Sequence, residues 1–441
     1  MTRVVAWAVV AVAARLAVSW ASADAGVFAD MAQYHERAVH LVTTGTLFPD
    51  ALRGPGYPAL LAGAYALGGV SFWTARVANA VVGGVLVLLT GWLAARAGAG
   101  PRAWIAAAIV AVYPSLVLSS VYLMPDAFYA TLAVLALLLV RHRSVAFALP
   151  AGLVAGAAVL TRSVGVSLVG AAALTAAWSA AVRTSSWRVA AARLAVFAAA
   201  AAVVVAPWLA FTTRVAGGPL LDTTSGMNVL LGNHPGATGR LAMADDAPLR
   251  QQYVAGAATE AEANARALGA GVAWATSHPR AWGRLALAKL GYLLGLEGRE
   301  HAWVYGQGYF GPRAGWVVRA WGWALIVSFP LLAIGAAYGA ARAPGPLDGS
   351  HVALIGFTLT TAALHVASFG ESRFHLPLVP ALAVAASLGS GPVGNAGWGR
   401  LLVATACLVA LGFAWSGQAP ELVAALARLS APDGWTTAPA Y

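Results

Sequence analysis

Residues 4–20, VVAWAVVAVAARLAVSW, form a continuous apolar segment, and residues 28–37, FADMAQYHER, change abruptly to polar character. An apolar stretch of about 20 residues is the length that a membrane-spanning helix needs. Asp30 then lies just outside the first span, ahead of an amphipathic stretch and of the segment RGPGYP at residues 53–58. A carboxylate in this place suggests an acid or base held at a membrane surface.

The composition extends this interpretation to the whole chain. Of its 441 residues, 60% are hydrophobic and only 10% are charged, and the mean hydropathy is +0.73. Soluble domains carry about 25% charged residues, so this chain cannot cover a water-facing surface. We expect an all-α polytopic membrane protein, because the apolar segments have helical length and lack the alternation of barrel strands.

The apolar segments predict about eleven transmembrane helices. They lie near 4–22, 71–95, 103–121, 125–140, 145–160, 164–182, 189–210, 315–340, 351–369, 373–389 and 400–416. The predicted units are a transmembrane module over 1–210 containing an outer loop at 23–70, a long outer loop at 211–314, terminal spans at 315–416 and a tail at 417–441.

The distribution of arginine predicts the orientation. The formal net charge of +11 would suggest nucleic acid on a soluble protein, but here the arginines lie mostly at helix ends. Positive charge collects in cytoplasmic loops, which places both outer loops, the turn at 124–126 and the corner at 371–373 on the extracytoplasmic side. We expect a multi-pass cell-membrane protein that contacts the lipid bilayer and no nucleic acid.

The first outer loop predicts two interfacial helices. Residues 30–44 place apolar side chains at helical spacing, with Gly45 as the stop, and residues 57–67 are apolar but short for a span.

The second outer loop is more varied. Residues 223–239 are rich in Gly, Asn and Pro and predict turns rather than a helix. Residues 259–268 predict a water-facing helix. We place residues 279–294 as an interfacial helix, because a spanning helix there would move Arg342 and Arg400 to the outside. A spanning helix remains an alternative.

Two aspartates are candidates for chemistry, and each has a structural alternative. Asp30 can instead be a helix N-cap paired with Gln33 in a capping box. Asp126 can simply favour the positive end of its helix. Both are expected on the same face of the membrane.

Other ionisable residues are candidates for binding. Glu371, Arg373 and His375 lie where two apolar segments meet, and ionisable groups at such depth are functional or paired; a Glu371–Arg373 pair is the structural alternative. Arg53, beside two glycines, and Lys289, the sole lysine, are candidates for a phosphate, with snorkelling to the membrane surface as the alternative.

Other chemistry finds little support. There is no nucleotide-binding loop and no serine nucleophile elbow. Cys407 is the only cysteine, so there is no disulfide framework and no cysteine metal site. The histidines of the long loop lack a close ligand spacing, which leaves cofactors unknown and a divalent metal open.

An ordered set of motifs resembles the GT-C class of membrane glycosyltransferases, and in particular the bacterial relatives of protein O-mannosyltransferases and lipid A aminoarabinose transferases (glycosyltransferase family 39-like). The matching pieces span roughly residues 1–390. They are Asp30-x-x-x-Tyr34 with Gly45, Arg53-Gly-Pro-Gly-Tyr57-Pro58, Tyr113-Pro114 leading to Pro125-Asp126, Gly156-x-x-x-Leu160-Thr-Arg162, Pro207-Trp208, and Arg373-Phe-His-Leu-Pro377-x-x-Pro380.

The resemblance implies a function. In that class the first-loop aspartate is the general base, a role that would fall on Asp30, and Asp126 would be the second acidic position. The donor in that class is a polyprenyl-phosphate sugar, and the transfer inverts the configuration at the sugar carbon. The acceptor would be a protein, lipid or glycan. Met31 and Gln33 depart from the class, which has Glu or Arg there in some members. We expect substrate contacts from Tyr34, Arg53, Tyr57, Lys289, Glu371, Arg373 and His375.

Two other functions remain as alternatives. A transporter or flippase of a lipid-linked saccharide would bind the headgroup without making a bond, and an internal repeat would favour it; we detect none. A scaffold for envelope assembly would not need buried acidic residues.

Overall fold

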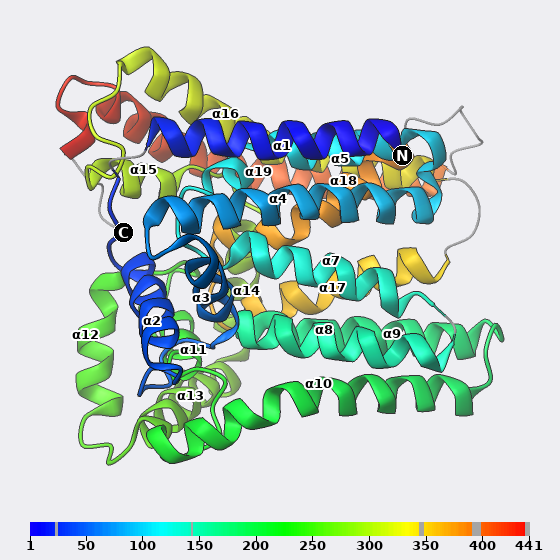
Figure 1. Cartoon of the computed structure of the whole chain (residues 1–441), viewed down its shortest axis with the longest axis horizontal. Helices are drawn as coiled ribbons and strands as arrows, with labels where there is room; N and C mark the ends of the chain where they lie inside the picture. The colour runs from blue at the N-terminus through cyan, green and yellow to red at the C-terminus, as the bar shows by residue number, and fades with distance from the viewer. Residues whose placement is uncertain (23–24, 143, 344–347, 390–397, 437–441) are drawn as a thin grey trace.

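The computed structural model describes all residues except 23–24, 143, 344–347, 390–397 and 437–441. Every regular element among the described residues is a helix, and the helices form a bundle with further helices gathered at one end (Figure 1). The bundle contains α1 (Thr2–Ala21), α4 (Phe72–Ala94), α5 (Ala103–Val112), α7 (Asp126–Val140), α8 (Ala148–Thr161), α9 (Ser167–Ala181), α10 (Trp187–Ala216), α16 (Gly315–Arg342), α17 (Gly349–Ala367), α18 (Val379–Leu388) and α19 (Trp398–Leu429). The remaining helices are α2 (Asp30–Thr44), α3 (Gly56–Gly68), α6 (Pro114–Leu118), α11 (Ser225–Gly232), α12 (Asp246–Leu249), α13 (Glu260–Ser277), α14 (Pro279–Leu293) and α15 (Arg299–Gly306).

The helices confirm the polytopic α-helical class. Within the described residues, seven helical stretches are long and apolar enough to cross a membrane, and three more apolar helices are shorter. One of the seven, Phe72–Val112, reverses at Gly98 and Gly100, whose φ angles are positive, and so forms the hairpin of α4 and α5. The count of eleven spans, the domain boundaries and the side of the membrane remain predictions.

Three segments differ from expectation. The span expected at 103–121 breaks between α5 and α6, because Pro114 holds Tyr113 in an extended conformation. The predicted turns at 223–239 contain helix α11, which begins where the Asp222 carboxylate accepts backbone hydrogen bonds from Thr224 and Ser225. Helix α19 continues to Leu429, through the point where we expected a tail.

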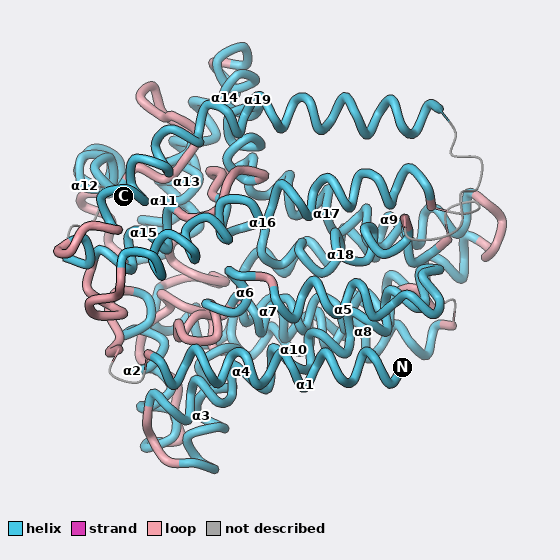
Figure 2. Tube along the Cα trace, turned by 90° about the horizontal axis from the view of Figure 1, so that it is seen from above, coloured by secondary structure: helices cyan, strands magenta, loops and turns pink. Residues whose placement is uncertain are grey.

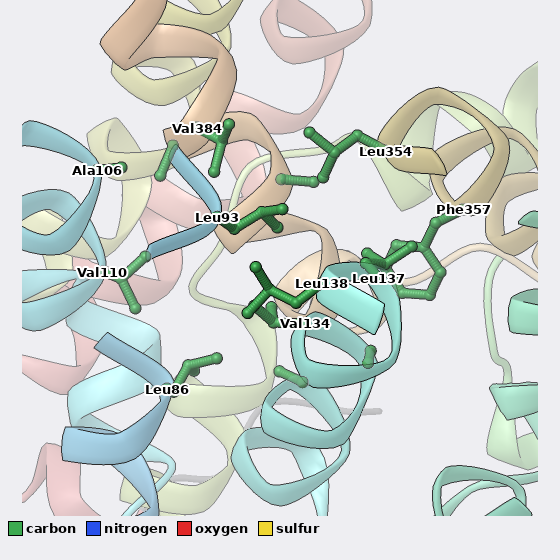
Figure 3. Close-up of a cluster of buried hydrophobic side chains, with 14 of the residues drawn as sticks. Leu86, Leu93, Ala106, Val110, Val134, Leu137, Leu138, Leu354, Phe357 and Val384 are labelled. Atoms are coloured by element: carbon green, nitrogen blue, oxygen red, sulfur yellow. The ribbon is translucent and has the colours of Figure 1, made fainter. Parts of the chain in front are cut away.

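The bundle interior is packed from small and branched side chains (Figure 3). Leu86 of α4, Val134 and Leu137 of α7 and Phe357 of α17 are all buried in one cluster. Close helix approach depends on small residues, as at Gly152 of α8, where a Cβ atom would lie 2.2 Å from the Phe197 carbonyl oxygen of α10. Burial of this kind fixes the long helices as a platform for the loops.

The loops of interest meet at one end of the bundle, away from the N-terminus (Figures 1 and 2). A second cluster packs Tyr34 of α2 and Tyr57 of α3 against Leu123 and Val304. The buried guanidinium of Arg76 donates to the backbone carbonyls of the first loop and of the 121 turn. Its acceptors are the carbonyls of Ser22, Ala25 and Val121. The first loop is thereby held over the bundle end.

Candidate functional site

Asp30 begins helix α2 but does not cap it. The N-cap is Ala29, with φ +48° and no side-chain capping bond, so the capping-box alternative is wrong. The Asp30 carboxylate instead accepts a 2.5 Å bond from Arg53, whose Nε also donates to Gln33 at 3.1 Å. The RGPGYP segment therefore carries a cation back onto the first-loop acid.

Asp126 lies buried at the start of α7 between two arginines. Its Oδ1 accepts from Arg162, at the end of α8, and its Oδ2 accepts from Arg373 at 3.0 Å. The other side of the Arg373 guanidinium contacts Glu300 of α15, also at 3.0 Å. Asp126 is thus the centre of a charge network from three parts of the chain, and a helix-dipole role alone does not account for it.

Two tyrosines of the first loop lie close to the charged groups of both Asp30 and this network. The rings of Tyr34 and Tyr57 pack edge to face with centroids 5.3 Å apart, and the Arg53 guanidinium lies over Tyr34 at 5.7 Å. Burial raises the pKa of the Tyr34 hydroxyl, against the opposing charge of Arg53, and raises that of Tyr57 further. Both hydroxyls therefore stay protonated and can donate hydrogen bonds.

Glu300 and His301 are site residues that our sequence reasoning missed. Burial raises the pKa of Glu300 to about 7, although the charge of Arg373 lowers it, and burial lowers the pKa of His301 to about 4. The signal was present as EGREH at residues 297–301, a dense run of ionisable residues in an apolar chain. Glu300 can change its protonation state near neutral pH, while His301 stays neutral.

His375 contacts Glu297, a residue that lines a small polar cavity at this end of the bundle. It is fully buried, with Nδ1 2.7 Å from the Leu293 carbonyl and Nε2 2.6 Å from Glu297. Tyr113 and Ser115 also donate to the Glu297 carboxylate. Burial disfavours ionised Glu297, but the bonds from His375 and these hydroxyls outweigh it and lower its pKa. His375 therefore acts on Glu297 and does not line the pocket itself.

Two predicted binding residues lie elsewhere. Glu371 pairs with Arg299 at 2.5 Å and accepts from the Leu241 amide, so the ion-pair partner that the structure gives it is Arg299, whereas the structural alternative named Arg373. Lys289 is fully buried and donates to Asn233 at 2.7 Å, and burial lowers its pKa to about 8. The hydrogen bond to Asn233 rules out snorkelling of Lys289 to the membrane surface. Lys289 also lies outside the lining of the two cavities at this end of the bundle.

Two cavities adjoin at this end of the bundle. A polar one of about 20 Å³, room for about one water, is lined by Asp126, Glu300 and Arg373 among others. An apolar one of about 380 Å³ lies between the end of α1 and helices α15, α16 and α19. Both cavities are lined by Tyr122, Gly298 and His301. An amphipathic ligand could therefore place a charged group in one and an apolar chain in the other.

A divalent metal does not fit these residues well. Over the part of the chain that the structure describes, no group of three His, Cys, Asp or Glu side chains gathers as a metal site. Both oxygens of Asp126 are engaged by arginine. The cationic side chains are therefore the groups that can bind a phosphate in this site.

The fold matches solved membrane proteins. ArnT from Cupriavidus metallidurans, bound to undecaprenyl phosphate, superposes with a TM-score of 0.52 at 17% identity, over 92% of this chain and 64% of that one. The archaeal oligosaccharyltransferase AglB from Archaeoglobus fulgidus, in complex with an inhibitory peptide and a dolichol-phosphate, gives 0.51 at 15% identity, over 99% and 56%. A structure of the Archaeoglobus fulgidus oligosaccharyltransferase with Zn and sulfate gives 0.53 at 17% identity, over 100% and 53%.

These likenesses concern the fold. No protein-family model matches the sequence, and no curated protein matches it. The chain spans somewhat more than half the length of the solved structures. Within that length it shares the polytopic helical fold of these solved structures, in agreement with the fold expected from the sequence motifs.

Proposed function

We propose that the protein is an integral membrane glycosyltransferase that moves a sugar from a polyprenyl-phosphate donor to an acceptor hydroxyl on the extracytoplasmic side. The observation that carries the proposal is the junction of the two cavities at Tyr122, Gly298 and His301. The apolar cavity falls in the range of about 300–1,000 Å³ typical of ligand sites. It suits a polyprenyl chain, whose phosphate would then reach the cations beside it.

Arg373 is the cation best placed for that phosphate. It lines the polar cavity, and its guanidinium already binds two carboxylates, those of Asp126 and Glu300. Arginine forms strong charge-assisted bonds with phosphate oxygens. Because the polar cavity holds about one water, the donor headgroup must displace Glu300 or Asp126 from Arg373 as it enters.

The transfer step uses the remaining groups. Asp30 lines neither cavity and is partly open to solvent, so the acceptor hydroxyl would approach from the solvent side. Asp30 takes its proton, and the hydroxyl oxygen attacks the anomeric carbon of the donor. The bond from that carbon to the phosphate oxygen breaks, and polyprenyl phosphate leaves with the electron pair, stabilised by Arg373. A single displacement of this kind inverts the configuration at the sugar carbon. Asp126 holds Arg373 and Arg162 in place.

The test is transfer by the purified protein. Incubation with a panel of polyprenyl-phosphate sugars should release polyprenyl phosphate with at least one of them, and an acceptor hydroxyl should increase the rate. Reconstitution in vesicles with a fluorescent lipid-linked saccharide distinguishes the alternative. Movement of the lipid between leaflets without release of polyprenyl phosphate would contradict the glycosyltransferase proposal.

A further inference from the structure

The last helix, α19, holds the backbone that leads into the polar pocket. Two of its side chains make hydrogen bonds to the segment 291–296, which ends α14 and precedes Glu297. The bonds join Trp415 Nε1 to the Leu294 carbonyl at 2.8 Å, Gln418 Nε2 to the Gly291 carbonyl at 3.1 Å, and the Leu296 amide to Gln418 Oε1 at 3.0 Å. A single glutamine thus links both ends of this segment.

The contact is close. A Cβ atom at position 295 would lie 2.5 Å from Gln418 Oε1, so Gly295 is what lets the backbone reach the helix. Leu296 is buried, and a buried amide needs its partner. Gln418 therefore fixes the position of the segment 291–296 relative to α19.

The wall of the polar pocket begins directly after this segment in the chain. Glu297 is the next residue after Leu296, and Glu300 lies three residues further on at the start of α15. Glu297 is tied to Tyr113 and His375 on the bundle side. A shift of 291–296 would therefore move both carboxylates relative to Arg373.

The same helix also forms a wall of the apolar cavity. One and more turns beyond Gln418, α19 contributes Leu422, Leu426 and Leu429 to the cavity lining. Leu426 packs so closely on α16 that a Cβ at Gly322 would lie 2.3 Å from it. The helix thus lines the apolar cavity and also contacts the segment 291–296.

We propose that Gln418 and Trp415 are positioning residues for the transfer site. They fix the segment 291–296, and through it Glu297 and Glu300, and they do so from a helix whose next turns contact whatever fills the apolar cavity. This inference deepens the proposed glycosyltransferase function and rests on it. It assigns a role in the site to Trp415, at the end of the last expected span, and to Gln418, at the start of the expected tail.

The test uses two variants with matched controls. Gln418→Met keeps the length of the side chain and removes both polar atoms, and Trp415→Phe removes the indole donor. Gln252→Met and Trp316→Phe make the same chemical changes at exposed positions. For each purified full-length protein we would measure kcat, KM for the lipid donor, and hydrogen–deuterium exchange over residues 291–300.

The expected result is a fall in kcat of about 10- to 100-fold for Gln418→Met, since displacement of about 1 Å can cost about 100-fold. KM for the donor should stay within about threefold, and exchange over 291–300 should become about tenfold faster, with both controls unchanged. A purely stabilising role would lower the yield of folded protein and leave kcat per folded molecule as it was.

Other outcomes overturn the inference. Unchanged exchange over 291–300 would show that Gln418 does not hold the segment, and faster exchange with normal kcat would show that the segment does not matter for transfer. If the wild-type protein transfers no sugar, the proposed function fails, and exchange still decides whether α19 positions the segment: faster exchange supports it, unchanged exchange overturns it.

Discussion

Replacing Asp30 with asparagine separates a chemical role from a structural one. The Asp30–Arg53 pair is partly open to solvent, with 41% of the Asp30 side chain and 22% of the Arg53 side chain exposed. Exposed pairs contribute at most about 1 kcal/mol, and no helix cap is lost because Asp30 makes none. We therefore expect a fall in melting temperature of no more than about 3 °C.

The expected loss of activity is much larger. A positioned general base contributes about 10²–10⁴ in rate, which corresponds to about 3–5 kcal/mol of barrier. The assay is release of polyprenyl phosphate by purified wild-type and Asp30→Asn proteins, with thermal unfolding measured on the same samples. Turnover should fall at least about 100-fold while unfolding hardly changes.

A second aspartate of the same loop provides the control. Asp50 pairs with Arg37, whose side chain is only 6% exposed, and it also accepts from the Leu52 amide at 3.1 Å. Asp50→Asn should therefore cost more stability than Asp30→Asn and leave turnover near normal. If turnover follows stability in both variants, or if Asp30→Asn stays within about threefold of wild type, Asp30 is not the base.

Further predictions concern the pocket and the membrane topology. Arg373→Met should weaken binding of polyprenyl phosphate roughly 10- to 150-fold, since a hydrogen bond to a charged group contributes about 1.5–3 kcal/mol; affinity within about threefold of wild type would contradict the phosphate assignment. Burial raises the folded-state pKa of Glu300 to about 7 from its ordinary 4.5, so its stabilising contribution is complete below pH 4.5 and is lost as pH rises through 7. Glu300→Gln should accordingly lose less thermal stability than wild type between about pH 5 and pH 8, and parallel curves would refute this. Cysteines introduced singly at the exposed positions Thr276 and Arg188, with the native cysteine removed, should be labelled from opposite sides of the membrane, and labelling from one side would overturn the orientation.

The fold could be predicted because a helix that crosses a membrane requires a long apolar segment, which is visible in the sequence. A run such as residues 4–20 has few alternatives to a spanning helix, and Gly45 ends α2 in the left-handed conformation that a glycine favours. The misses were local. Polar composition at 223–239 predicted turns, but the Asp222 side chain provided a helix start.

The site was harder to predict, because ion pairing depends on contacts between distant segments. Arg373 was recognised as functional or paired, yet its partners Asp126 and Glu300 come from helices 247 and 73 residues away in the chain, as the residue numbers give. Lys289 was predicted to bind a phosphate because it is the sole lysine of the sequence. In the folded chain its partner is Asn233, a contact that the sequence did not indicate. Spacing along a chain identifies acids and cations but does not pair them.

The charge balance of the assembled site has a consequence for catalysis. Its charged groups are Asp30, Asp126, Glu297, Glu300, Arg53, Arg162 and Arg373, which make four carboxylates against three guanidinium groups when all are ionised. A donor phosphodiester adds a negative charge, so an acid of the site must then take up a proton or lose its partner. Glu300 is suited to this, because its pKa of about 7 lets it become neutral at little cost when phosphate replaces it on Arg373. Asp126 keeps Arg162 as a second partner in that state and still holds Arg373 in place. Arg373 therefore stays fixed as it receives the phosphate, and Glu300, the carboxylate that leaves Arg373, is the one that can be protonated.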